Sequence, residues 1–186
     1  MRIISGKFRS RHLQSLPGTD IRPTSDRLRE TLFNVLSAGN PQALEGSVWI
    51  DLFAGSGAVG IEAISRGAEM VHFAESSKEA ADLILKNLQS LGIKAGFRIV
   101  RQDALRTIQR WREGKADYIF IDPPYRMEKA YAEVLAALPS SLMVLSETNI
   151  IVEHQKKFDP GENIRSLRRV RLLKQGDAAL SFYRNG

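Results

Sequence analysis

The stretch that decides the fold is Val48-Trp49-Ile50-Asp51-Leu52-Phe53-Ala54-Gly55-Ser56-Gly57-Ala58-Val59-Gly60. Its first five residues form an apolar run with one acid, as expected for a strand buried in a parallel sheet. Residues 55–60 match the pattern G-x-G-x-x-G, in which glycines permit a tight strand-to-helix turn and a close approach of backbone to a ligand. This order predicts the first βα unit of an open α/β sheet.

The residues that follow continue the alternation of strand and helix. Periodicity predicts helices over 57–65, 78–91, 104–112 and 128–138, and strands over 48–52, 70–74, 97–100, 118–121 and 148–154. Residues 167–174 and 178–183 flank Gln175-Gly176-Asp177, a pattern typical of a hairpin, so these two strands must be antiparallel. We predict an α/β fold with a mostly parallel sheet, helices on both faces and a C-terminal antiparallel hairpin.

The segment before the glycine loop has a different pattern. Residues 1–21 contain short extended pieces without a helical period, which indicates an arm or hairpin outside the core. Thr24 or Ser25 can cap a helix whose apolar face holds Leu28 and Leu32. We therefore expect a basic arm and capping helix over residues 1–40 and the main domain over residues 41–186.

Composition narrows the classes of partner. The chain has 186 residues, 27 basic against 21 acidic, for a net charge of +6. Arg2, Lys7, Arg9 and Arg11 all precede the first acid. Such a cluster is typical of surfaces that contact phosphates, although a solvated basic face is the equal alternative from charge alone.

Several kinds of site and location are disfavoured by composition. There is no cysteine, which excludes disulfides and thiolate-metal sites, and three scattered histidines make us expect no metal. No apolar run approaches the ~20 residues of a membrane span, and residues 1–6 do not resemble a signal peptide. We expect a cytoplasmic protein with no membrane association.

Acids end four of the predicted strands: Asp51, Glu75, Asp103 and Asp122. Glu75 follows Gly55 by 20 residues, which by a simple rule indicates a dinucleotide whose ribose it binds. Asp51, however, would repel a pyrophosphate on the loop and suits the ammonium group of S-adenosylmethionine. Asp103 could accept from the adenine amino group, so we favour S-adenosylmethionine; a tight turn without a ligand is the alternative.

The last of these acids opens the turn Asp122-Pro123-Pro124-Tyr125, directly after the apolar run of residues 118–121. Asp122 and the backbone carbonyl of Pro123 can accept hydrogen bonds from an exocyclic amine and aim its lone pair at a donor methyl. Proline contributes a fixed φ and no competing N–H, and Tyr125 offers a ring on which a flipped base can stack. A capped strand-to-loop turn is the alternative, but the glycine loop upstream favours amine methylation.

At this point the chain resembles a known family. Asp51 to Gly57 and Asp122 to Tyr125 resemble motifs one and four of amine-directed, S-adenosylmethionine-dependent methyltransferases. Three longer stretches narrow the resemblance to bacterial 16S rRNA guanine-N2 methyltransferases of the RsmD type: Met1-Arg2-Ile3-Ile4-Ser5-Gly6-Lys7-Phe8-Arg9, Arg22-Pro23-Thr24-Ser25-Asp26-Arg27-Leu28-Arg29-Glu30, and Asp51 through Gly67. It covers residues 1 to about 135, then only Leu180-Ser181-Phe182-Tyr183.

The resemblance implies a seven-stranded, Rossmann-like class I methyltransferase sheet and a guanine N2 target, guanine 966, in 16S rRNA of the assembling small subunit. We expect a monomer. Carried over by position, the methionine part of the donor would lie against Phe53, Ala54, Gly55, Ser56 and Gly57. Glu75 would bind the ribose, Asp103 and Ala104 would contact the adenine, and Arg22, Pro23 and Thr24 would close over the donor. Arg2, Lys7, Arg9 and Arg11 would meet RNA, and residues 140–176 receive no role.

Three other functions remain open from the sequence. The same turn could methylate a DNA adenine N6 or a protein glutamine, although 186 residues leave little room for a DNA-recognition domain and a protein substrate needs no basic arm. A nicotinamide-dependent oxidoreductase would use the glycine loop but leave Asp122 to Tyr125 without a task. A non-catalytic RNA-binding protein on the same scaffold would not need Asp122.

Overall fold

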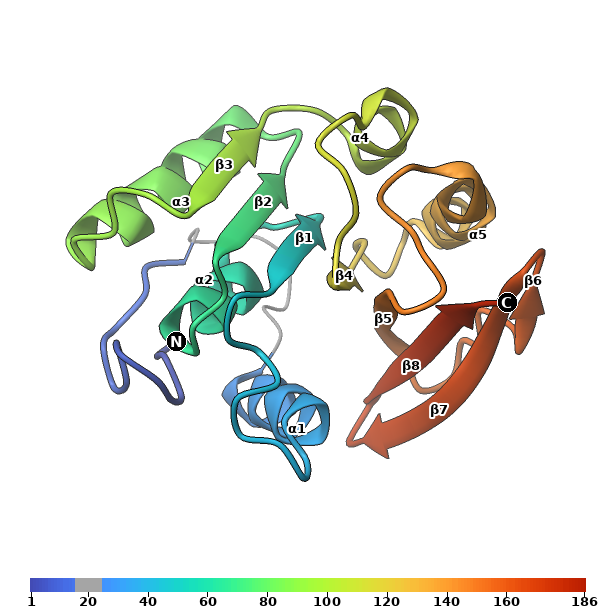
Figure 1. Ribbon diagram of the computed structural model, residues 1–186, viewed down its shortest axis with the longest axis horizontal. Coiled ribbons are helices and arrows are strands. Elements are labelled where there is room, and N and C mark those ends of the chain that lie inside the picture. The colour runs from blue at the N-terminus through green and yellow to red at the C-terminus, as the bar shows by residue number, and fades with distance from the viewer. Residues whose placement is uncertain (16–24) are drawn as a thin grey trace.

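One sheet of eight strands organises the computed structural model, which describes residues 1–15 and 25–186 (Figure 1). The strand order is β3-β2-β1-β4-β5-β8-β7-β6. The strands are β1 (Val48–Leu52), β2 (Met70–Ala74), β3 (Phe97–Val100), β4 (Tyr118–Ile121), β5 (Asn149–Gln155), β6 (Asn163–Ile164), β7 (Leu167–Gln175) and β8 (Ala178–Asn185). β1 to β5 run parallel, while β8 is antiparallel to both β5 and β7.

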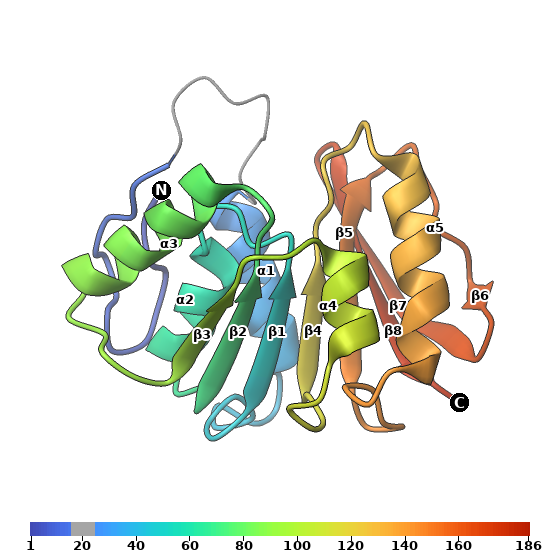
Figure 2. The ribbon, with the colours of Figure 1, turned by 90° about the horizontal axis from the view of Figure 1, so that it is seen from above.

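Helices cover both faces of this sheet (Figures 1 and 2). On one face lie α1 (Asp26–Leu36), α2 (Ala58–Ser65) and α3 (Lys78–Ser90), which share a core with one set of strand side chains. On the other lie α4 (Ala104–Arg110) and α5 (Glu128–Ala137), the latter continued by the 3₁₀ turn η1 (Leu138–Ser140). The predicted α/β class, parallel sheet and C-terminal hairpin are confirmed. No helix in the described ranges is long and apolar enough to cross a membrane.

The eighth strand is the difference from the seven-stranded sheet that the resemblance implies. β6 has only two residues and pairs with β7 at the edge of the sheet. A strand this short has too few side chains to show an alternating pattern, so periodicity could not reveal it. The sheet otherwise has the expected elements.

The N-terminal arm is a hairpin, as its pattern suggested, but it contributes to the core. The Ile3 N–H donates to the Arg11 carbonyl at 2.9 Å, and Arg2 bridges His12 in an antiparallel sense. Ile3 and Leu13 are 1% and 5% exposed and pack in the same core as α1 to α3. The expectation that residues 1–21 lie outside the core is therefore wrong for these two side chains, because single inward residues give no periodic signal.

α1 begins as its sequence predicts. The Ser25 side chain accepts a hydrogen bond from the Leu28 N–H at 3.1 Å, so Ser25 is the N-cap. Thr24, the other candidate cap, lies outside the described residues. The apolar face of α1 then buries Leu28, Leu32 and Phe33 against the sheet.

A buried carboxylate joins the arm, α1 and α2. Glu62, fully buried in α2, accepts hydrogen bonds from the N–H groups of Ile4 and Ser5 at 2.8 and 3.0 Å. Arg66 Nε donates to it at 2.8 Å, and Arg29 Nε of α1 lies 3.7 Å away. Charges without such partners are costly to bury, so these contacts fix where the three segments meet.

Gly6 lets the arm approach the end of α2. The Lys7 N–H donates to the Ser65 carbonyl at 2.7 Å, and the Ser65 hydroxyl donates to the Ser5 carbonyl at 2.6 Å. Gly6 has φ +81°, and a Cβ there would lie 1.9 Å from the Ser65 carbonyl oxygen. Any larger residue would push the arm off α2.

We expect Glu62→Gln to lower the free energy of unfolding by about 3 kcal/mol, because it removes the buried carboxylate that pairs with Arg66 and faces Arg29, although Arg29 retains its ion pair with Asp26. Urea denaturation measures this difference. Glu69→Gln, at an exposed position in the loop before β2, is the matched control and should stay within about 0.5 kcal/mol of the parent. Equal stability of the two variants would contradict a central role for Glu62.

Candidate functional site

Four carboxylates lie on one face of the sheet at the carboxyl ends of its strands. Side chains alternate between the two cores: Trp49, Phe73, Phe120 and Ile151 lie in the α1–α3 core, and Ile50, Ala74, Ile121 and Val152 in the α4–α5 core. Continuing this alternation puts Asp51, Glu75, Asp122 and Glu153 on the α1–α3 face. Ligands bind at this edge in open α/β sheets.

Strand register brings the glycine loop next to the Asp122 turn. Leu52 pairs with Ile121 between β1 and β4, and Ile121 pairs with Val152 between β4 and β5. The next residue in each strand is therefore level with Asp122: Phe53 on one side and Glu153 on the other. Two motifs about 70 residues apart in the sequence thus form one site.

The N–H groups of the glycine loop point at protein acceptors. The Gly55 N–H donates to Glu75 Oε2 at 2.9 Å, and the Ala54 and Gly57 N–H groups donate to the Ala74 and Ala54 carbonyls at 3.1 and 2.7 Å. A pyrophosphate seat needs such N–H groups directed at the ligand. The loop geometry therefore disfavours a dinucleotide, in agreement with the argument from Asp51.

Glu75 itself closes this turn. Its second carboxylate oxygen accepts from the Ser77 N–H at 2.8 Å, at the start of α3. A carboxylate has about four acceptor positions, so two remain for ribose hydroxyls. This position is compatible with the ribose-binding role expected for Glu75.

Gly60, the third glycine of the pattern, allows α2 to pack closely against β2. A Cβ at Gly60 would lie 2.3 Å from Phe73 Cε1 and 2.7 Å from Val71 Cγ1, so only glycine lets α2 lie this close to β2. The Gly60 N–H then donates to Asp51 Oδ2 at 3.1 Å. The carboxylate of Asp51 is held directly beneath the loop.

Burial raises the pKa of the Asp51 carboxyl group toward neutrality. It is 2% exposed, and this burial raises its pKa to about 7; the Gly60 N–H partly opposes the rise and the charge of Glu75 adds to it. Between pH 4 and 7 the folded chain therefore keeps a proton that the unfolded chain has lost, so stability falls as pH rises through this window. A bound ammonium group would favour the ionised carboxylate, which fits the methionine end of S-adenosylmethionine.

The two residues expected at the adenine lie at the start of α4. Asp103 is the N-cap of this helix and accepts from the Arg106 N–H at 2.8 Å, with Arg106 Nε 3.4 Å from its other oxygen. Ala104 is 4% exposed and packs in the α4–α5 core. Asp103 remains half-exposed at the edge of the sheet, while Arg22, Pro23 and Thr24 lie outside the described residues.

The Asp122 turn is anchored by a tyrosine that the sequence analysis did not select. The Tyr131 hydroxyl of α5 lies 3.3 Å from the Pro123 carbonyl and 3.1 Å from the Glu153 carbonyl, so it can donate to either. Burial, followed by the negative charges of Asp122 and the neighbouring groups, raises the pKa of Tyr131 far above its usual value. The hydroxyl therefore keeps its proton and holds the turn against β5.

Asn87 of α3 is a second residue that the sequence analysis missed. Its side-chain nitrogen donates to the carbonyls of Ser56 and Gln14 at 3.0 and 3.1 Å, and its oxygen accepts from the Gln14 N–H at 2.9 Å. Asn87 thus connects the glycine loop to the end of the arm. A buried polar residue on the apolar face of a predicted helix was the available signal.

Glu153 is the third site residue that the sequence analysis missed. It is 3% exposed although it carries a carboxylate, and it lines a cavity of about 190 Å³ together with Tyr125. The cavity is closed by residues 25–28 of α1 and its preceding cap and by the β7–β8 hairpin. Glu153 was visible in the sequence as an acid near the end of the predicted fifth strand, but its position level with Asp122 depends on the strand register.

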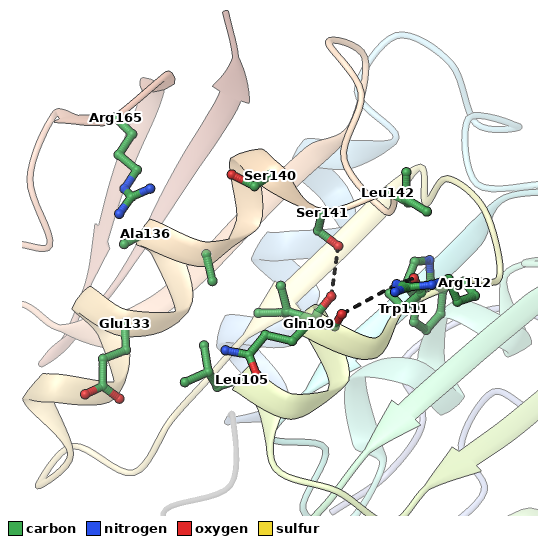
Figure 3. A pocket seen from close by; sticks show the side chains of 12 residues that line it. Leu105, Gln109, Trp111, Arg112, Glu133, Ala136, Ser140, Ser141, Leu142 and Arg165 are labelled. Atoms are coloured by element: carbon green, nitrogen blue, oxygen red, sulfur yellow. Dashed lines mark hydrogen bonds between the residues drawn. The ribbon is translucent and has the colours of Figure 1, made fainter.

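A separate cavity of about 500 Å³ lies between α4 and α5 (Figure 3). Ser141 forms part of its wall and donates to the Ile108 carbonyl at 3.2 Å. Ser140 and Leu142, also in the wall, follow the C-terminal end of α5 and so lie toward the amino ends of the strands. None of the four carboxylates of the candidate site lines it.

The four residues expected to meet RNA are all exposed on the arm: Arg2, Lys7, Arg9 and Arg11. Arg11 donates to the Ser90 carbonyl at the end of α3 at 2.9 Å, which holds its side chain against the body of the protein. Within residues 1–15 and 25–186, no cluster of three or more histidines and acids could hold a metal ion.

Residues 1–184 match the family described as Conserved hypothetical protein 95. YlbH of Bacillus subtilis is 32% identical over 99% of this chain and 98% of its own length. Ribosomal RNA small subunit methyltransferase D of Escherichia coli K12 is 35% identical over 83% of this chain and 75% of its own.

Solved structures share the fold. The structure of yhhF from Escherichia coli covers 100% of this chain and 97% of its own, with a TM-score of 0.81 and 31% identity. SMU.776, whose structure contains S-adenosylhomocysteine, has a TM-score of 0.64 at 14% identity over 85% of this chain and 48% of its own. That second likeness concerns the fold alone.

We expect the affinity for S-adenosylhomocysteine to rise by up to about tenfold per pH unit between pH 5 and 7 and to level off above, because its ammonium group binds the ionised form of Asp51. Calorimetric titration of the ligand measures this profile. Asp51→Asn should bind more weakly at pH 8 and lose the pH dependence, whereas Glu45→Gln, at an exposed position, should behave as the parent does. A flat profile in the parent would remove the ammonium-binding role of Asp51.

Proposed function

The chain belongs to the Conserved hypothetical protein 95 family, and on that premise we propose that it transfers a methyl group from S-adenosylmethionine to N2 of a guanine in small-subunit 16S rRNA, guanine 966. The curated relative from Escherichia coli is named as a methyltransferase of the small-subunit rRNA. The buried Asp51 beneath the glycine loop supports the choice of a donor with an ammonium group. The guanine and its position follow from the resemblance of the three sequence stretches.

The single observation that carries the proposal is the shared edge of β1 and β4. The glycine loop that follows Leu52 and the turn that follows Ile121 are level with each other because those two residues pair in register. A donor held by the loop and an amine held by Asp122 would then meet with their reacting atoms in contact. Alignment of this kind is the main requirement for transfer of a methyl group between two bound molecules.

When bound, S-adenosylmethionine supplies an electrophilic methyl group on a sulfonium. Asp122 would accept a hydrogen bond from the target amine and orient its lone pair. It would take the amine proton as the N–C bond forms and the methyl–sulfur bond breaks, with that bond's electron pair left on sulfur. The Pro123 carbonyl can accept the second amine hydrogen, because a carbonyl has two lone pairs and Tyr131 occupies one at most. Tyr125, at the wall of the cavity, provides the ring on which the base stacks.

We assign RNA binding to the N-terminal arm. Its four exposed cations lie on a hairpin that hydrogen bonds fasten to α2 and, through Asn87, to the glycine loop. Residues 1–40 then serve as the RNA-binding part and residues 41–186 as the methyltransferase domain. The partner is 16S rRNA within the assembling small subunit in the cytoplasm, and the protein acts as a monomer.

Asp122→Ala should lower methyl transfer by about 10²- to 10³-fold, because it removes an acceptor aimed at the reacting amine. The substrate is small subunits from cells that lack this protein, and mass mapping of their 16S rRNA follows the appearance of methylguanine. Affinity for S-adenosylhomocysteine should change less than about twofold, and Asp82→Ala on α3 is the control. Near-normal transfer by Asp122→Ala would remove its assigned role, and a product other than N2-methylguanine would refute the proposed reaction.

Charge reversal on the arm tests the RNA contact. Arg9→Glu with Arg11→Glu should weaken binding to small-subunit rRNA and lower the slope of log affinity against log salt by about two, because each arginine would neutralise one phosphate. Filter binding at several salt concentrations measures the slope. Arg110→Glu with Lys115→Glu, at exposed positions at the end of α4 and in the loop before β4, is the charge-matched control. An unchanged slope in the arm variant would show that these arginines are solvated and do not contact RNA phosphates.

A further inference from the structure

The cavity beside Tyr125 is lined by acceptors. Glu153 contributes a carboxylate that is 3% exposed, and Asp122 follows the neighbouring strand at the same level. Adjacent strands lie about 4.8 Å apart, so the two carboxylates can address neighbouring atoms of one small group. The cavity volume, about 190 Å³, is below the ~300–1,000 Å³ of drug-sized sites and suits a single base.

A third acceptor lies at the end of β7. Gln175 lines the cavity, and its Oε1 is buried with no hydrogen-bond partner within residues 1–15 and 25–186. A buried acceptor without a donor is costly. Gln175 is therefore placed to accept from a group that enters the cavity, and that group must carry N–H or O–H donors.

Two exposed charged side chains lie at the rim of the cavity, the cation Arg27 of α1 and the acid Asp177 of the β7–β8 turn. A cation at the rim and acceptors within match a nucleotide whose phosphate stays outside and whose base enters. Tyr125 in the wall adds a surface for stacking.

Among the bases with an exocyclic amine, guanine alone presents a ring N–H beside it. Its N1–H and N2 amine are adjacent donors, whereas adenine and cytosine place an unprotonated ring nitrogen beside the amine. That nitrogen is an acceptor and would face a carboxylate with no proton between them. Buried groups that must hydrogen-bond reject a substrate that lacks the partner.

We propose that Glu153 selects guanine by accepting a hydrogen bond from the ring N1–H, while Asp122 accepts from the N2 amine that is methylated. This inference rests on the proposed function and adds the residue that chooses the base. In this inference Glu153 recognises the substrate base, while the glycine loop binds the methyl donor. It also explains why an Asp-Pro-Pro-Tyr turn that could serve adenine would not do so in this chain.

The test compares two small subunits, one with the target guanosine and one in which 2-aminopurine riboside replaces it through ligation of a synthetic RNA segment. 2-Aminopurine keeps the N2 amine but has an unprotonated N1. For the parent, kcat/KM on the guanine subunit should be at least about 10-fold higher than on the 2-aminopurine subunit. That ratio corresponds to one hydrogen bond to a buried charge. Glu153→Gln should lose about 10- to 100-fold on guanine, yet gain on 2-aminopurine relative to guanine, because its amide can donate to N1.

Two controls separate recognition from folding. Glu133→Gln, exposed on α5, should match the parent on both substrates. Glu153→Asp keeps the charge and should keep the preference for guanine at a lower rate, which maintains the test if Glu153→Gln does not fold. The melting temperature and S-adenosylhomocysteine affinity of each variant show whether the donor site is intact.

An equal loss on both substrates by Glu153→Gln, or full activity on guanine, would overturn the role of Glu153 while leaving the proposed function in place. A changed preference in Glu153→Asp would also overturn it. A parent that methylates neither subunit would instead refute the proposed function, and this inference with it. The outcomes therefore distinguish the two failures.

Discussion

The buried carboxylate of Glu62 is the contact on which the arrangement of the site depends. Removing a carboxylate from water costs several kcal/mol unless charges and N–H groups replace the water. Here the replacements come from three separate segments: the arm through Ile4 and Ser5, α1 through Arg29, and α2 itself through Arg66. None of these segments can move without leaving the charge unsatisfied.

This constraint reaches the site because α2 starts at the glycine loop. The end of α2 that holds Glu62 binds the arm, and its first turn follows Gly57 and brings the Gly60 N–H to Asp51. Asn87 adds a second connection between the loop and the arm. The basic hairpin is thereby held at a defined position relative to the donor loop, as positioning of an RNA substrate requires.

The acids at the edge of the sheet divide into two environments. Asp51 and Glu75 lie beneath a loop whose N–H groups they bind, and Asp51 has a pKa near neutrality because burial outweighs its one hydrogen bond. Glu153 lines a cavity together with Gln175, whose amide oxygen has no hydrogen-bond partner among the described residues, and Asp122 lies level with Glu153 on the next strand. Asp51 thus suits a cationic ligand group and Glu75 the ribose hydroxyls, whereas the other pair suits a donor-rich base. The strand order alone brings the two pairs together.

The fold and half of the site could be read from the sequence. Alternating apolar runs, glycines and helix caps are local patterns, and each depends on neighbours within a few residues, so the strand and helix bounds and the α/β class were predicted closely. The glycine loop and Asp122-Pro123-Pro124-Tyr125 carry enough chemistry to indicate the reaction. Tertiary structure alone decided the rest. Glu62, Asn87, Tyr131 and Glu153 matter through partners far away in the chain, and burial, which sets the pKa of Asp51, exists only once the sheet and helices have packed.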